Sequence, residues 1–189
     1  MVVTPSSALA LQAPLPMFTL PDTRTDSGFK LGKMVSSTSA SSKNLTIIAV
    51  ICNHCPFVVH IITQLASVLN QGHRAGHHVF AISANDTEHY PQDGPDKMAE
   101  FAAANGFEFP YLYDESQAAV KALQAQCTPE FFVFDGHQQL VYRGQFDGAR
   151  PGSDKPVTGE SLSSAIKAAL NGEVVSRQHP SMGCNIKWK

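Results

Sequence analysis

Two cysteines spaced three residues apart are the strongest chemical signal in the sequence. Cys52 and Cys55 enclose an asparagine and His54 in the motif CNHC. The apolar run over residues 45–51 predicts a buried strand directly before the motif, and helical periodicity begins directly after it. The N-terminal end of a helix carries unpaired N–H groups and partial positive charge, which favour a thiolate. The motif is therefore expected to be a dithiol that opens and closes.

Each residue of the motif is expected to have its own role. Cys52 should be the more exposed thiol, at the start of the helix, and should attack the substrate. Cys55 should then resolve the mixed disulfide. His54, when cationic, would stabilise the thiolate over the disulfide and make the pair a stronger oxidant. The Cys52–Cys55 pair supplies the redox chemistry itself, so no cofactor is predicted.

Two other interpretations of CNHC stay open. The cysteines are also compatible with two buried thiols that do no chemistry, or with a metal-binding module. Such a module would hold copper or zinc with Cys52, Cys55 and one of His54, Cys127 or Cys184. Structural zinc usually takes four ligands from paired motifs, and this sequence has one pair. We therefore predict redox chemistry and no metal.

The overall composition excludes several classes of protein. A length of 189 residues with 43% hydrophobic content fits one domain over residues 1–189. With 14 basic and 16 acidic residues, the net charge of -2 provides no broad basic surface for nucleic acid. Four cysteines with unrelated spacings are too few for a secreted disulfide scaffold. The sequence shows neither a signal peptide nor a membrane-spanning run, so a cytoplasmic location without membrane partners is expected.

The elements that must position the dithiol follow in the order β, α, β, α, α, β, β, α. Strands are predicted at 45–51, 79–83, 130–134 and 140–144, and helices after residue 55, from 95 to before 106, and over 115–126 and 158–170. This order predicts an α/β protein with a central mixed sheet and helices on both faces. Residues 17–20 and 29–31 are expected to form an N-terminal β-hairpin extension. Residues 1–16 should be a loose lead-in and residues 172–189 a C-terminal tail.

A polar loop from Asn85 to Pro95 follows the predicted strand 79–83. Ligands of open α/β sheets usually lie beyond the carboxyl ends of the strands. The loop is therefore expected either to border the dithiol or to be an ordinary connection. The sequence does not separate these two alternatives.

The order of elements resembles the thioredoxin fold once Thr128 and Pro129 are included, because they open the later strand at 130–134. In that fold the proline is cis and packs beside the dithiol, and its neighbouring backbone is free to pair with a bound thiol substrate. The resemblance implies that Pro129 shapes the substrate groove and that Thr128 is an auxiliary residue there. A cis peptide bond before proline is a minority state that tertiary structure must enforce.

A closer resemblance is to the peroxiredoxin-like branch of the redoxin (alkyl hydroperoxide reductase/thiol-specific antioxidant) superfamily. It rests on APLPMFTLPD at 13–22, CNHCPFV at 52–58, FPYLYDESQ at 109–117, CTPEFFVFD at 127–135, LVYRGQFD at 140–147 and GCNIKWK at 183–189. The resemblance implies thiol-dependent antioxidant activity on disulfide-bearing proteins, small thiols or peroxides. A thioredoxin- or glutathione-type system would act as the reductant.

The active-site pattern of typical peroxiredoxins is only partly present. Their motif is PxxxTxxC, and aligning Cys55 with the peroxidatic cysteine places Cys52 at the Thr position and Ile48 at the Pro position. Pro129 stands where the family has its arginine. Arg143 either replaces that cation or forms a structural ion pair. Thiol–disulfide exchange is therefore the first hypothesis. A thiol peroxidase with Cys55 peroxidatic and Cys52 resolving is the second.

The two remaining cysteines are auxiliary candidates. Cys127 lies two residues before Pro129 and is either a third redox thiol or, as we favour, a small buried hydrophobic residue. Cys184 would be a distant resolving thiol if the tail folded back over the site. A tail thiol without a partner is the favoured interpretation.

Overall fold

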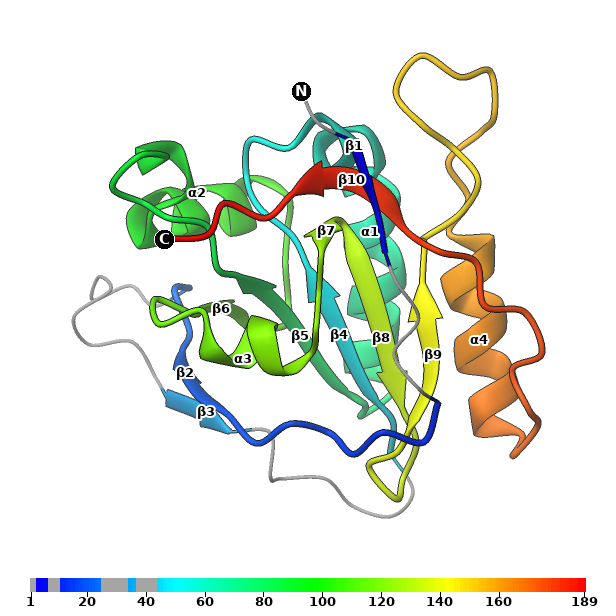
Figure 1. Cartoon of the computed structure of the whole chain (residues 1–189). Helices are drawn as coiled ribbons and strands as arrows, with labels where there is room; N and C mark the ends of the chain where they lie inside the picture. Colours follow the sequence, from blue (N-terminus) through cyan, green and yellow to red (C-terminus); the bar gives the residue numbers. More distant parts are fainter. Residues whose placement is uncertain (1–2, 7–10, 25–33, 37–43) are drawn as a thin grey trace.

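The computed structural model describes residues 3–6, 11–24, 34–36 and 44–189. Its centre is a five-stranded sheet in the order β6-β5-β4-β8-β9 (Figure 1). The strands are β4 (Thr46–Val50), β5 (His78–Ser83), β6 (Tyr111–Tyr113), β8 (Glu130–Phe134) and β9 (Leu140–Gly144). The three strands β4, β5 and β6 pair in parallel, whereas β8 is antiparallel to both β4 and β9. The central sheet is therefore mixed, as predicted.

Helices cover both faces of this sheet. Those in the described residues are α1 (Pro56–Arg74), α2 (Pro95–Ala104), α3 (Ala118–Ala122) and α4 (Glu160–Leu170). Buried residues of α1, α2 and α4 share one core cluster, and those of α3 belong to a second cluster. Strand β4 contributes to both, because Ile47 and Ala49 enter the first cluster while Ile48 and Val50 enter the second. This arrangement confirms the predicted fold class.

A second, three-stranded sheet lies across the end of the first. It consists of β1 (Val3–Pro5), β10 (Met182–Asn185) and β7 (Cys127–Thr128), with β10 in the middle and both pairings antiparallel. In Figure 1 the red β10 runs alongside β1 above β7. Gly183 permits this close approach, because a Cβ atom there would lie 2.0 Å from the Thr128 carbonyl oxygen. Strands thus form within both the predicted lead-in and the predicted tail.

The N-terminal extension contains the antiparallel pair of β2 (Thr19–Pro21) and β3 (Met34–Ser36). The first arm of the predicted hairpin overlaps β2. The second predicted arm, residues 29–31, lies outside the described residues. The observed partner strand therefore comes later in the sequence than the predicted second arm.

Two helices begin or end at other residues than the sequence pattern predicts. Helix α3 is shorter than the predicted 115–126, because Gln117 before it and Gln124 after it adopt positive φ angles of 63° and 53°. Helix α4 begins at Glu160, two residues later than predicted, with Gly159 at its N-cap. Thr158 lies one residue before this N-cap, and its hydroxyl accepts the Glu160 N–H at 3.3 Å.

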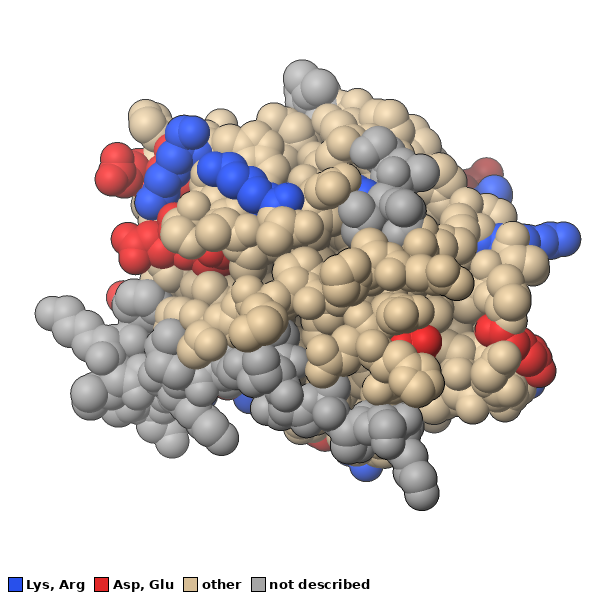
Figure 2. All heavy atoms as spheres, turned by 60° about the horizontal axis from the view of Figure 1, so that its bottom comes forward, with Lys and Arg blue, Asp and Glu red and all other residues tan. Residues whose placement is uncertain are grey.

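The surface of the described residues has mixed charge. In Figure 2 the basic and acidic side chains lie mainly toward the edges of the face in view, and tan residues fill its centre. No helix in the described ranges is long and apolar enough to cross a membrane.

The burial pattern of α1 predicts unequal costs for two truncations on the same helix. Leu65 is fully buried, whereas Val59 is 52% exposed. Leu65→Ala should lower the free energy of unfolding by about 2–5 kcal/mol because it leaves a cavity. Val59→Ala should change it by less than about 0.5 kcal/mol. Urea denaturation of both variants checks this, and equal losses would contradict the assigned orientation of α1.

Candidate active site

The CNHC motif lies where β4 passes into α1, and Cys55 is the N-cap residue of the helix. Pro56 occupies the first helical position, where its missing N–H costs nothing. Cys52 therefore lies before the helix rather than at its start. Its exposed fraction is 1% and that of Cys55 is 0%, so both thiols are buried and exposure does not single out Cys52 as the attacking thiol. The turn folds both sulfurs inward, against the segment Thr128–Pro129.

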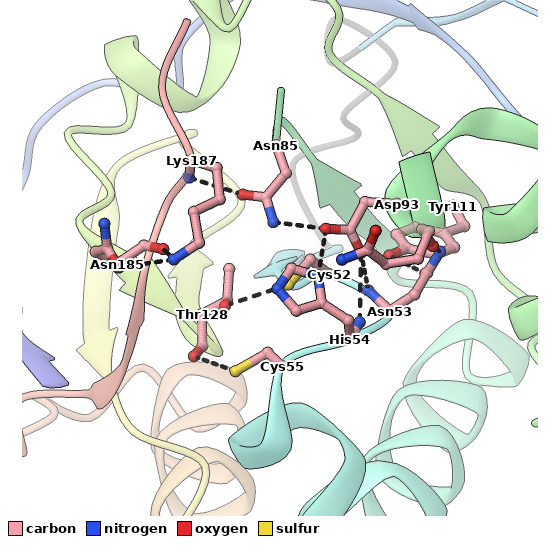
Figure 3. A network of polar contacts seen from close by, with 11 residues as sticks. Cys52, Asn53, His54, Cys55, Asn85, Asp93, Tyr111, Thr128, Asn185 and Lys187 are labelled. Atoms are coloured by element: carbon pink, nitrogen blue, oxygen red, sulfur yellow. Dashed lines mark hydrogen bonds and ion pairs between the residues drawn. The ribbon is translucent and has the colours of Figure 1, made fainter. Parts of the chain in front are cut away.

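Thr128 contacts both sulfurs of the pair. The peptide bond from Thr128 to Pro129 is cis, as the resemblance implies. The Thr128 hydroxyl oxygen lies 3.6 Å from the Cys52 sulfur, and the protonated Cys55 thiol donates to the Thr128 carbonyl oxygen at 3.1 Å (Figure 3). The structure thus brings Cys52, Cys55 and the cis-proline segment together.

The backbone beside the cis-proline is already occupied. Thr128 pairs with Cys184 in the antiparallel ladder between β7 and β10. The expectation that this backbone stays free for a substrate is therefore wrong. The tail supplies the strand that fills this place.

The electrostatic environments of the two thiols differ. A hydrogen bond from the Cys52 thiol, with further ones from the Thr128 side chain and the Val58 N–H, lowers the pKa of Cys55 to about 5. Burial and the Thr128 carbonyl, which favours the protonated thiol, act against this shift. The pKa of Cys52 is raised by its hydrogen bond to Cys55, then by burial and the negative charge of Asp93. These shifts favour ionisation of Cys55 before Cys52, whereas the sequence favoured Cys52 as the attacking thiol.

Asp93 organises the other side of the motif. It is fully buried at the end of the 3₁₀ turn Pro91–Asp93. One carboxylate oxygen accepts the backbone N–H groups of Asn53 and His54 at 2.9 and 3.3 Å. The other lies 2.6 Å from the His54 Nδ1 atom and accepts the Asn85 side-chain N–H at 2.8 Å (Figure 3). The loop 85–95 therefore does border the dithiol.

His54 faces Asp93 and stacks on Tyr90. The ring centroids of His54 and Tyr90 are 5.6 Å apart with the planes 6° from parallel. One ligand atom each from His54, Asp93 and Cys52 lie within 4.8 Å of one another. Any positive charge on His54 is thus placed beside Cys52 and neutralised by Asp93. This trio differs from the metal-ligand sets expected from the sequence, and its carboxylate is already fully engaged by protein donors.

Sequence reasoning missed Asp93, Asn85 and Tyr111 as parts of the site. The Tyr111 hydroxyl donates to the Asn53 side-chain oxygen at 3.0 Å and so helps to hold the CNHC turn. Asn85 also accepts the backbone N–H of Lys187 at 2.9 Å, which ties the C-terminal tail to the same network. The only available signal was the position of loop 85–95 after a parallel strand.

Arg143 lies outside the dithiol site as a structural residue. Its Nε donates to a Glu130 carboxylate oxygen at 2.6 Å, and one terminal nitrogen donates to the Gln124 carbonyl at 2.7 Å. Both Arg143 and Glu130 are buried. The arginine is therefore committed to an ion pair, the alternative that the sequence left open beside an oxygen-binding role.

The two auxiliary cysteines have different surroundings. Burial, followed by the negative charge of Glu130, raises the pKa of Cys127. Side chains alternate along a strand, so Cys127 and Thr128 point to opposite sides of β7. Cys184, in contrast, is 5% exposed, and its thiol lies close enough to Cys55 that the two groups shift each other's pKa, that of Cys55 downward and that of Cys184 upward. The tail thiol thus has a partner, contrary to the favoured expectation.

A small hollow opens beside the cis-proline. Its walls include apolar side chains from the first turns of α1, from β10 and from the segment after β9, namely Phe57, Ile61, Pro129, Phe146 and Met182. Two larger hollows lie along α4 and the segment that follows it, away from the sulfurs. The hollow beside Pro129 is therefore the one among these three that adjoins the cis-proline segment.

Comparison with known proteins agrees with this geometry. The Redoxin family model matches residues 11–162. The chain belongs to the Redoxin family. An uncharacterized conserved protein from Geobacillus kaustophilus is 42% identical, with a TM-score of 0.92 over 100% of this chain and 97% of that one. A hypothetical protein from Sinorhizobium meliloti 1021 is 40% identical, with a TM-score of 0.91 over 98% of each chain.

More distant structures share the fold of this redoxin. A thiol:disulfide interchange protein of the thioredoxin family from Chlorobium tepidum TLS is 17% identical, with a TM-score of 0.62 over 86% of this chain and 99% of that one. A search of curated proteins gave no match. The thioredoxin-like fold expected from the sequence is thereby confirmed.

The environment of Cys55 predicts the pH dependence of the reduced redoxin. The ultraviolet absorbance of one thiolate should appear as the pH rises through about 5, because the folded state lowers the pKa of Cys55. Cys55→Ser should abolish this step. Cys52→Ala should move it to higher pH by removing the first hydrogen-bond donor, and Cys52→Ser should move it less. A wild-type titration with its first step near the ordinary thiol pKa would contradict the assignment.

Proposed function

We propose that this redoxin is a thiol–disulfide oxidoreductase whose electron carrier is the Cys52–Cys55 dithiol. The observation that carries the proposal is the contact of both sulfurs with Thr128, beside a cis-proline and at the N-terminus of α1. Family membership supports thiol-based redox chemistry, and the name of the Chlorobium tepidum structure supports disulfide exchange. The reductant would be a small thiol or a thioredoxin- or glutathione-type protein.

The proposed reaction begins at Cys55. Its thiolate attacks one sulfur of the substrate disulfide, forming a mixed disulfide and releasing the other sulfur as a thiolate. Cys52 then loses its proton and attacks the Cys55 sulfur, which closes the Cys52–Cys55 disulfide and releases the second substrate thiol. Two substrate sulfurs are reduced and two protein sulfurs are oxidised. This order reverses the roles expected from the sequence, because the helix N-terminus stabilises a thiolate at Cys55.

The hollow beside Pro129 is the proposed docking place for the substrate. Its walls adjoin Cys55 through the first turn of α1, and Met182 on β10 is 46% exposed. A substrate chain would contact these apolar side chains rather than add a strand beside Thr128, where β10 already lies.

Reduction of insulin by dithiothreitol tests the proposed activity. Cys55→Ser should bring the rate to that of dithiothreitol alone, because it removes the attacking thiolate. Cys52→Ser should lower the rate about tenfold or more, since the mixed disulfide then lacks its first resolving thiol. Cys127→Ser is the matched control and should retain the wild-type rate. Undiminished activity of Cys55→Ser would remove the mechanism.

A thiol peroxidase is the second candidate, and the lowered pKa of Cys55 favours it. The thiolate would attack the peroxide oxygen to form a sulfenic acid and release water or an alcohol, and Cys52 would condense with it to a disulfide. Arg143 gives no help, since Glu130 holds it. Wild-type protein should consume peroxide slowly compared with its insulin reduction. A faster peroxide reaction that needs Cys55 would favour this second candidate.

A further inference from the structure

Cys184 belongs to the same buried cluster as the Cys52–Cys55 pair, although the proposed reaction does not use it. Strand β10 brings this thiol from the C-terminal tail to the residue opposite Thr128. The same Thr128 contacts Cys55 through its carbonyl oxygen at 3.1 Å. Cys55 therefore has one redox partner before it in the motif and another thiol on the strand that covers it.

Strand β10 is held firmly in this place. Gly183 packs against the Thr128 carbonyl so closely that no larger residue fits. Beyond the strand, the Lys187 N–H donates to Asn85, and the Lys187 carbonyl accepts the Asp86 N–H at 2.8 Å. Asn85 in turn donates to Asp93, which holds the CNHC turn. The thiol of Cys184 is therefore fixed to the same framework as the dithiol.

We propose that Cys184 is a third redox-active thiol, which exchanges with the Cys52–Cys55 disulfide and moves the bond to Cys55–Cys184. The inference rests on the proposed function, because that function generates the Cys52–Cys55 disulfide. Cys184 occupies the backbone position that pairs with Thr128, directly before the cis-proline. Three buried thiols then share one disulfide, with Cys55 as the sulfur common to both bonds.

The exchange balances without an added oxidant. The Cys184 sulfur attacks the Cys55 sulfur, the Cys52–Cys55 bond breaks, and the Cys55–Cys184 bond forms. The proton lost by Cys184 goes to the departing Cys52 sulfur. The protein keeps one disulfide throughout, and the net change is that Cys52 becomes a free thiol again.

The electrostatics favour this order of events. In the reduced protein, burial and then the hydrogen bond and negative charge of Cys55 raise the pKa of Cys184 to about 12. Once Cys55 is in a disulfide it carries no negative charge, so that part of the shift disappears. Cys184 thus ionises more readily when a disulfide is available for attack. Burial and the negative charge of Asp93, which persist when Cys55 is in a disulfide, raise the pKa of Cys52, so the released Cys52 sulfur keeps the proton that Cys184 loses.

Disulfide mapping in the full-length chain tests the proposal. Reduced Cys52→Ser protein is treated with one equivalent of hydrogen peroxide, free thiols are alkylated, and linked peptides are identified by mass spectrometry. The expected product is the Cys55–Cys184 disulfide with Cys127 alkylated. Cys52→Ser/Cys184→Ser should instead stop at a Cys55 sulfenic acid, trapped by dimedone. Cys52→Ser/Cys127→Ser is the matched control and should still form the Cys55–Cys184 bond.

The wild-type protein separates failure of this inference from failure of the proposed function. After oxidation, part of it should carry the Cys55–Cys184 bond with Cys52 alkylated, and Cys184→Ser should carry only the Cys52–Cys55 bond. The role of Cys184 alone would be overturned by two results together. Oxidised wild type would carry only the Cys52–Cys55 disulfide, and Cys184 would stay a free thiol both there and in oxidised Cys52→Ser protein. Cys55 left unmodified in Cys52→Ser would also overturn it. Absence of the Cys52–Cys55 disulfide from oxidised wild type would instead count against the proposed function.

Discussion

The site depends on one residue, Thr128, being held between two sheets. Its hydroxyl oxygen faces the Cys52 sulfur, its carbonyl oxygen faces the Cys55 sulfur, and its backbone pairs with Cys184. The two sulfurs of the CNHC motif and the backbone of Cys184 from the C-terminal tail therefore meet at one residue beside the cis-proline. Because the surrounding strands β8 and β10 fix this backbone, the distances among the sulfurs are set by the fold and not by the CNHC turn alone.

The second constraint is the separation of charge along the motif. Asp93 lies on the Cys52 side, where its negative charge opposes a second anion, and the N-terminus of α1 lies on the Cys55 side, where a thiolate is favoured. The His54 Nδ1 atom lies 2.6 Å from the buried carboxylate, and the His54 ring stacks on Tyr90. Burial makes each of these interactions stronger than it would be in water. The two thiols of the reduced pair consequently differ in pKa, which is lowered for Cys55 and raised for Cys52.

Local sequence patterns predicted the parts of the fold whose signals are local. The apolar run before CNHC and the helical periodicity after it correctly located β4 and α1, and the strands predicted at 130–134 and 140–144 are β8 and β9. Helix α3 was overextended because nothing in the sequence marks Gln117 and Gln124 as residues with positive φ. Strand β10 was missed because its residues, MGCN, show no alternation and gain their pairing from β1 and β7.

The sequence identified the cysteines and the proline of the site, but it did not identify the residues that surround them and hold them in place. CNHC and Thr128–Pro129 carry their own signatures, whereas Asp93 is one acidic residue in a polar loop and Cys184 one thiol in a tail. Both acquire meaning only through contacts that link residues far apart in the sequence. The assignment of the thiolate changed for the same reason, because the N-cap position of Cys55 and the carboxylate near Cys52 are properties of the folded chain.

The most direct test of the account is an equilibrium titration of the wild-type protein against the dithiothreitol couple, with every disulfide quantified by peptide mapping. The account predicts a single two-electron transition in which all disulfide bonds contain Cys55 and Cys127 stays a free thiol at every potential. Oxidised protein whose disulfides omit Cys55, or in which Cys52 and Cys55 both remain free thiols, would contradict it.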